Sequence, residues 1–273
     1  MAKTKADWEI QREVRVIRVV RGAVSATDIA YAEEKLAHAA RVAGGPVLQL
    51  EVRMTQHQDP ARALHAYVEM SADINGRPTR AHWAAATMHE AIDGAAQRLT
   101  LHIERLRDRA QATHARLADP TTWHHGQALT ARASGMYERP LEEREIRRRK
   151  VVDWPTETID EAIFDLEILD HDFFAFTNLA TGEANVVARE RNRYRVVQQH
   201  PDPETIAGVV ALVVLDPGTA PVCSIADARL LLEIEAPSAN GHAHFVFFLD
   251  DVDGRPSVLY RRRDGHDGLI QAG

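Results

Sequence analysis

The second half of the chain contains a sequence that occurs twice, and this repeat restricts the fold more than any other feature. Residues 172–189 match residues 244–261 at a constant offset of 72, and the helical stretches before them match at an offset of 66. The six-residue difference falls in the loop 236–241, where an insertion costs little. The sequence therefore predicts two tandem β-α-β-β-β domains, at residues 145–200 and 205–273.

Each predicted domain begins with a strand, at residues 146–154 and 209–215, and has a single helix to cover its sheet. Side chains alternate between the two faces of a strand, and both sets are apolar in residues 173–176 and 245–249. An uncovered apolar face on so small a domain is a partner surface or an aggregation hazard. The alternative is that each helix, with its loops, covers its own domain.

We expect the two copies to pair as an internal pseudo-dimer in a monomeric chain, because a tether raises the effective concentration of one copy at the other. The residues predicted to form this pair are Phe173, Phe174, Phe176, Phe245, Phe247, Phe248 and Tyr260.

Residues 8–113 have the periodicities of a β-α-β-β-β-α domain, so the whole chain is expected to be α+β. Ser25 or Thr27 can cap the first helix, and the dipeptide Asn75-Gly76 is typical of a tight hairpin between strands. The second helix, predicted at residues 87–113, has an apolar stripe for the sheet. The stripe consists of Ile92, Ala95, Leu99, Ile103 and Leu106. Residues 114–144 lose this periodicity and are predicted to form a linker.

Composition excludes several classes of protein. The single cysteine, Cys223, rules out an internal disulfide framework and fits a reducing cytoplasm. The longest apolar run is far shorter than the roughly 20 residues of a membrane helix, so no membrane partner is expected. The histidines lack ligands at metal-site spacing, and no motif resembles an active site. We expect neither metal nor cofactor, and no catalytic residues.

Charge is distributed unevenly along the chain. Residues 1–113 carry a net charge of +2 and residues 114–150 carry +3, whereas residues 151–200 and 201–273 carry −6 each. A polyanion would therefore be attracted to the first half and repelled by the second.

Two rows of basic residues lie on the predicted helices of the first half. Residues at helical spacing form one row on the first helix and a longer row on the second, and such rows suit a phosphate backbone. The predicted RNA-binding residues are Lys35, His38, Arg41, Arg98, His102, Arg105 and Arg109. The alternative is a solvated helix face, because Glu104 and Asp108 are interspersed. The basic run Arg147–Lys150 is predicted to pair with the acidic helix that follows it.

Several motifs resemble the hibernation-promoting factors. Residues 12–113 resemble the ribosome-binding domain of this family in element order and in residues 88–93 with Arg98 and Leu99. Residues 146–197 resemble its C-terminal domain, most specifically at residues 169–177, and residues 261–270 resemble it in the second copy.

The resemblance implies a stress-induced factor that binds rRNA in the decoding region of the small ribosomal subunit. It implies that messenger and transfer RNA are excluded and that Lys35, Arg98 and Arg105 touch the rRNA. Leu101 departs from the family, where a basic residue is common at this position. Since single-copy relatives pair two chains and thereby two ribosomes, the duplicated domain predicts hibernation of single ribosomes. The alternatives are an RNA-binding or sigma-modulating regulator that acts off the ribosome, and an enzyme that uses the tandem domain as a scaffold.

Overall fold

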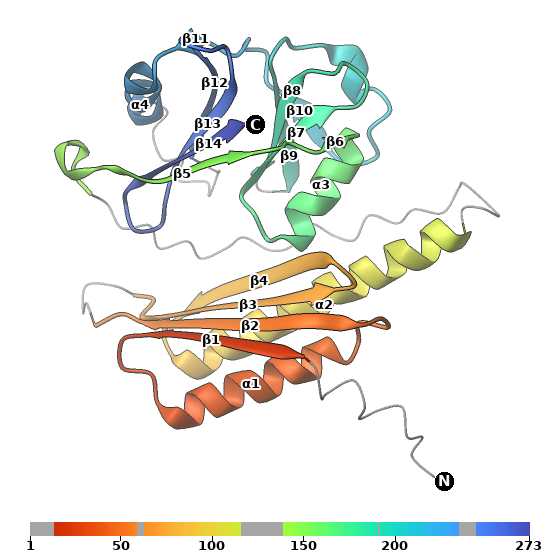
Figure 1. Cartoon of the computed structure of the whole chain (residues 1–273), viewed down its shortest axis with the longest axis vertical. Coiled ribbons are helices and arrows are strands. Elements are labelled where there is room, and N and C mark those ends of the chain that lie inside the picture. Colours follow the sequence, from red (N-terminus) through yellow and green to blue (C-terminus); the bar gives the residue numbers. More distant parts are fainter. Residues whose placement is uncertain (1–13, 59–62, 116–138, 191, 235–243) are drawn as a thin grey trace. The chain divides into compact units, whose positions relative to one another are not determined.

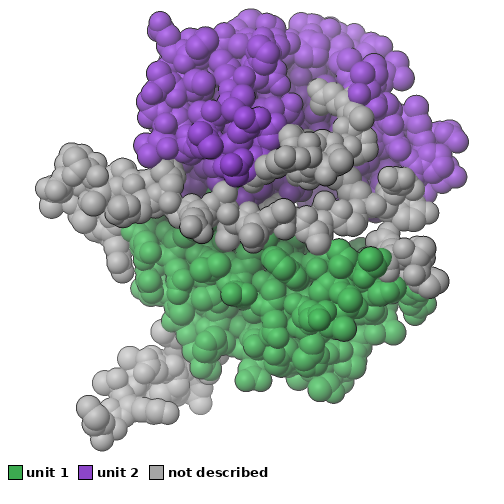
Figure 2. All heavy atoms as spheres, turned by 180° about the vertical axis from the view of Figure 1, so that it is seen from behind, with its two compact units in different colours: residues 1–124, 167–170 green, residues 125–166, 171–273 purple. Residues whose placement is uncertain are grey.

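The computed structural model describes residues 14–58, 63–115, 139–190, 192–234 and 244–273 (Figure 1). The chain divides into two compact units (Figure 2). Unit 1 comprises residues 1–124 and 167–170, and unit 2 comprises residues 125–166 and 171–273.

Unit 1 has the predicted order β-α-β-β-β-α, with both helices on one face of a four-stranded sheet (Figure 1). The sheet order is β1-β2-β3-β4; β1 pairs with β2 in parallel, and the other pairs are antiparallel. The elements are β1 (Arg15–Arg21), α1 (Ala26–Ala40), β2 (Val47–Gln56), β3 (Ala66–Ile74), β4 (Arg77–Ala85) and α2 (Met88–Ala115).

Local sequence signals explain these boundaries. The Ser25 hydroxyl accepts a hydrogen bond from the Asp28 backbone N–H and so caps α1. Asn75 and Gly76 both have positive φ angles, +53° and +80°, as the tight turn between β3 and β4 requires. The predicted apolar stripe of α2 is buried, from Ile92 at 0% exposure to Leu106 at 5%.

Unit 2 holds both copies of the repeat. The helices α3 and α4 are separated by the predicted 66 residues, and the strands β7 and β12 by 72. The elements that continue the chain are η3 (Leu141–Glu143), β5 (Ile146–Val152), β6 (Thr156–Glu157), α3 (Ile159–Ile168), β7 (Phe173–Asn178), β8 (Ala184–Glu190), β9 (Arg193–Gln198), η4 (Pro203–Ile206), β10 (Val213–Leu215), β11 (Val222–Cys223), α4 (Ile225–Ile234), β12 (Phe245–Asp250), β13 (Pro256–Arg261) and β14 (Asp267–Ala272).

The first strand of each copy lies in the sheet of the other copy, and here the structure differs from the prediction of two separate tandem domains. One sheet has the order β10-β9-β8-β7-β6 and the other β11-β12-β13-β14-β5. Strand β5 pairs in parallel with β14, and β10 pairs in parallel with β9. The predicted boundary between residues 200 and 205 therefore separates two stretches of sequence, but each sheet contains strands from both.

Short segments carry the chain from one sheet to the other. Residues 153–155 connect β5 to β6, and residues 216–221 connect β10 to β11. Trp154 in the first segment and Ala220 in the second are buried in one apolar cluster, together with residues of both copies. Because the crossing segments are part of this core, the exchange of the strands and the pairing of the copies depend on the same buried residues.

The shared cluster contains the apolar faces that the two copies present to each other. The Phe173 ring stacks on Phe245 at a centroid distance of 5.1 Å and lies 5.3 Å from Tyr260. Gly268 is needed opposite Tyr260, since a Cβ there would lie only 2.4 Å from the Tyr260 ring. The buried members of the cluster are Trp154, Ala184, Val186, Ala188, Ala220, Phe245, Phe247 and Val258.

Three of the residues predicted to join the copies lie on the opposite faces of their sheets. Phe174 and Phe176 pack with α3, and Phe248 packs with α4. Alternation along β7 and β12 explains the difference, because neighbouring residues of a strand point to opposite faces. Contacts between the copies therefore involve Phe173, Phe245, Phe247 and Tyr260 but not these three.

Among the described residues, no helix is both long enough and apolar enough to cross a membrane.

Candidate RNA-binding surface

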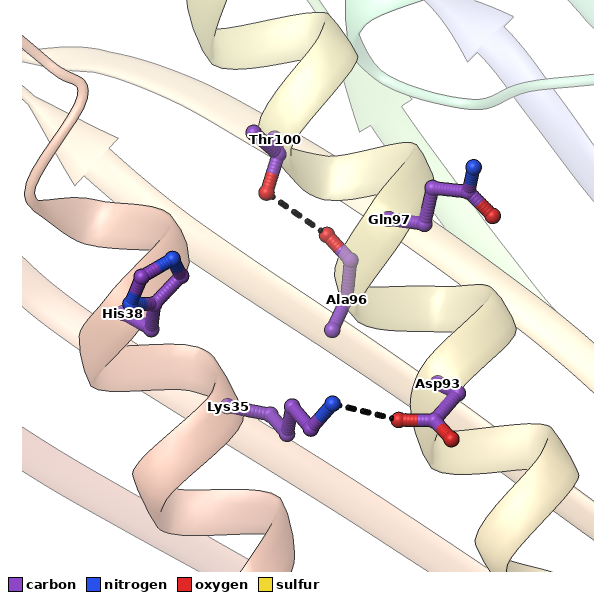
Figure 3. A pocket seen from close by; sticks show the side chains of 6 residues that line it. All are labelled: Lys35, His38, Asp93, Ala96, Gln97 and Thr100. Atoms are coloured by element: carbon purple, nitrogen blue, oxygen red, sulfur yellow. Dashed lines mark hydrogen bonds and ion pairs between the residues drawn. The ribbon is translucent and has the colours of Figure 1, made fainter.

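The basic residues of α1 line a groove between the two helices of unit 1. Lys35 and His38 from α1 face Ala96, Gln97 and Thr100 from α2 across an open groove of about 300 Å³ (Figure 3). His38 is exposed, and so is Arg41, which follows the last residue of α1. This part of the predicted basic surface is accessible to a large ligand.

Lys35 is held in place by an acidic residue of α2. Its Nζ lies 2.8 Å from Asp93 Oδ1 (Figure 3). The Tyr31 hydroxyl donates to the same carboxylate oxygen at 2.8 Å. The hydrogen bond to Asp93 raises the pKa of Lys35 to about 12 and lowers the pKa of Asp93 below its usual value. Lys35 is therefore charged at neutral pH, but its charge is partly compensated.

His102 was predicted to contact RNA, but in the structure it does not lie at the surface. Its ring is buried at 0% exposure, and Nδ1 lies 2.7 Å from the carbonyl oxygen of Arg80 on β4. Burial lowers the pKa of His102 to about 4, so the ring is neutral at pH 7. His102 lies next to the apolar stripe on the helical wheel, and this position turns it toward the sheet.

Arg98 also lies on the flank of α2 nearest β4. Its guanidinium is placed over the ring of Trp83, with Cζ 5.9 Å from the centroid, and the residue is 4% exposed. Arg105 and Arg109 are half-buried farther along α2. The predicted rows on α1 and α2 therefore do not form one surface: Lys35 and His38 face the groove, whereas Arg98 and His102 face the sheet edge.

Arg107 is not among the predicted RNA-binding residues, but it lies on the groove side of α2. The aliphatic part of its side chain lies beside Gly44, just beyond the end of α1, and the side chain is 38% exposed. Helical spacing could have identified it, since Asp93, Ala96, Thr100 and Arg107 follow one another at intervals of three, four and seven residues. The basic surface therefore includes Lys35, Arg41 and Arg107.

The other candidate residues lie apart from this surface. Strand β5, with Arg147–Lys150, is in unit 2 at the edge of a sheet, and six of its seven residues are exposed. Cys223 ends β11 and is half-buried, and burial raises the pKa of its thiol. No group of three or more potential metal-ligating side chains occurs within the described ranges.

Burial of neutral His102 predicts a loss of stability in acid. The unfolded chain takes up a proton near pH 6.5, whereas folded His102 does so only near pH 4. The free energy of unfolding should therefore fall by up to about 3 kcal/mol as the pH drops through this window. Urea unfolding at pH 7 and pH 4.5 measures the difference, which should shrink in His102→Gln and persist in His38→Gln. Equal pH dependence in the two variants would contradict the assignment.

Models of known families match parts of both halves of the chain. The family model described as Sigma 54 modulation protein / S30EA ribosomal protein matches residues 17–111. The model described as Sigma 54 modulation/S30EA ribosomal protein C terminus matches residues 141–196. The chain belongs to the S30EA family. Because it has both regions, it is of the long form of the hibernation-promoting factors.

Individual relatives match shorter parts of the S30EA chain. A stretch of 47 residues is 45% identical to the chloroplastic ribosome-binding factor PSRP1 of Spinacia oleracea, and it spans 17% of this chain and 16% of that relative. The N-terminal domain of Protein Y from Thermus thermophilus is 23% identical, with 34% of this chain and 99% of that chain covered, at a TM-score of 0.29. A ribosomal subunit interface protein from Coxiella burnetii is 15% identical, with 36% and 98% covered, at a TM-score of 0.27.

Family membership relates the protein to ribosomal proteins. The S30EA family consists of ribosome-associated proteins, and the matched relative from Spinacia oleracea is named a ribosome-binding factor.

Proposed function

We propose that this protein binds rRNA in the decoding region of the small ribosomal subunit, excludes messenger and transfer RNA, and keeps single ribosomes inactive under stress. The basic residues in and beside the α1–α2 groove support the first part. Lys35, Arg41 and Arg107 can neutralise phosphates without reading base sequence.

The observation that carries the single-ribosome proposal is the apolar cluster shared by the two copies within one chain. A single-copy relative needs a second chain to cover the corresponding face. Here Phe173 of the first copy stacks on Phe245 of the second, and the strands β5 and β10 are exchanged. The apolar surface that would otherwise pair with a second chain is therefore occupied within this chain.

Sedimentation of ribosomes with the purified protein tests both parts. We expect the protein to migrate with small subunits and with single ribosomes, without a ribosome-dimer peak. The triple variant Lys35→Ala, Arg41→Ala, Arg107→Ala should bind at least tenfold more weakly and show a shallower dependence of affinity on salt. The control Arg193→Ala removes an exposed arginine of unit 2 and should bind normally.

Two results would contradict the proposal. A ribosome-dimer peak that depends on the protein would exclude the single-ribosome mechanism. Binding to free RNA or to a transcription factor, without migration with small subunits, would favour a regulator that acts off the ribosome.

A further inference from the structure

Strand β5 forms an edge of its sheet and is the most basic element of unit 2. It follows β14 at the end of the strand order, so only one side of its backbone is paired with a described strand. Four of its seven residues, Arg147–Lys150, are basic, and all four are exposed. The unpaired side of β5 therefore presents backbone N–H and C=O groups together with positive charge.

Two of these arginines lack a compensating charge among the residues that the structure describes. Arg147 Nε lies 3.3 Å from a Glu145 carboxylate oxygen. Within the part of unit 2 that the structure describes, neither Arg148 nor Arg149 has an ion-pair partner. Their charge is therefore available to a ligand, although residues 151–273 carry a net charge of −12.

The register of β5 divides its basic residues between the two faces of the sheet. Arg149 is opposite Leu269, which packs under α4, whereas Lys150 is opposite Ile270, on the other face. Arg148 is opposite Gly268, next to Tyr260 of the shared cluster. A strand added to the free edge in the plane of the sheet would have basic side chains above and below it.

The equivalent strand of the other sheet is neither long nor basic, so the fold does not require a long basic strand at this edge. Strand β10 occupies the corresponding edge, pairs with β9, and has only three residues, Val213, Val214 and Leu215. The edge of one sheet is thus short and apolar, and the edge of the other is long and basic.

We propose that the free edge of β5 binds an acidic, extended segment of a partner protein, which adds to the sheet as a further strand. Backbone hydrogen bonds would supply affinity, and carboxylates on both faces of the added strand would pair with the basic side chains. A phosphate backbone matches this edge less well, because it offers no N–H donors to the free carbonyl groups. A second copy of β5 is disfavoured by charge repulsion. The proposal does not depend on ribosome binding.

The test measures binding of a labelled ten-residue peptide of alternating glutamate and valine to the full-length protein by fluorescence anisotropy. The control peptide has the same net charge but two central prolines, which prevent strand addition. We expect saturable binding of the first peptide that is at least tenfold tighter than that of the second. Hydrogen exchange should slow at the outward-facing amides of β5.

Protein variants locate the site. The pair Arg148→Gln, Arg149→Gln should weaken binding of the alternating peptide at least tenfold. The matched pair Arg193→Gln, Arg255→Gln removes the same charge from exposed positions elsewhere in unit 2 and should change binding less than twofold.

Four results would overturn the proposal. Equal binding of the two peptides would show attraction by charge alone, and tighter competing binding of a ten-nucleotide single-stranded RNA would identify an RNA surface. Self-association of the protein through β5 would mean that the edge serves a second copy. Absence of peptide binding, together with aggregation of the Arg148→Gln, Arg149→Gln variant, would show that the charges only protect the edge.

Discussion

A chain that ends at residue 208 is expected to dimerise. Truncation there removes the second copy from β10 onward, which exposes Phe173 and the rest of the shared cluster and leaves β5 without β14. Two truncated chains can cover the apolar cluster of each other and pair their β5 strands again. In such a dimer, β5 of each chain takes the place of β10 beside β9 of the other. Light scattering coupled to gel filtration should show a doubled mass, and ribosomes sedimented with this variant should form dimers.

The matched control is a fragment of residues 139–273, which retains both copies and should remain monomeric. Phe173→Asp in the truncated chain should prevent dimerisation, because it places a charge in the apolar contact. A truncated chain that stays monomeric with an intact sheet, as judged by circular dichroism and hydrogen exchange, would show that a single copy can cover its own faces. The single-ribosome mechanism would then lose its physical basis.

Phe247→Ala is expected to destabilise unit 2 by about 3–5 kcal/mol, the usual cost of removing a buried aromatic side chain. Phe247 is 4% exposed and lies 6.2 Å from the Trp154 ring, so the cavity would open between the copies at a crossing segment. A domain of this kind has only about 5–15 kcal/mol of stability in total. Urea unfolding should therefore show a large shift in the transition of unit 2 and little change in that of unit 1.

Val252→Ala is the control, because its side chain is 89% exposed in a turn of the same copy and its loss should cost less than about 0.5 kcal/mol. Equal midpoints for the Phe247→Ala variant and the unmodified protein would mean that the shared cluster contributes little to stability. The two copies would then be held together mainly by their exchanged strands.

The elements of unit 1 could be predicted from the sequence because their signals are local. Ser25 caps α1, the Asn75-Gly76 turn fixes the β3–β4 hairpin, and the stripe around Leu99 sets the buried face of α2. The basic surface was predicted less well. Helical spacing shows that Arg98 and His102 share a flank of α2, but it does not show that this flank packs against Trp83 and Arg80 of β4.

The exchange of strands could not be predicted from periodicity. Alternation shows which residues of a strand share a face, as with Phe173 and Phe174, but it does not show which sheet the strand joins. Strands β5 and β10 occupy the same position in the two copies, and either would satisfy the pattern in either sheet. The choice depends on contacts between residues far apart in the chain, such as Trp154 with Phe247.

The exchanged strand also sets an order of events during synthesis. Glu145 and His266, which meet at the start of the β5–β14 pair, are 121 residues apart in the chain. While the protein is being made, β5 emerges long before its partner and must wait until the second copy has been translated. Closing so distant a contact is slow, so folding of the C-terminal region should be completed late, after most of the chain has left the ribosome that made it.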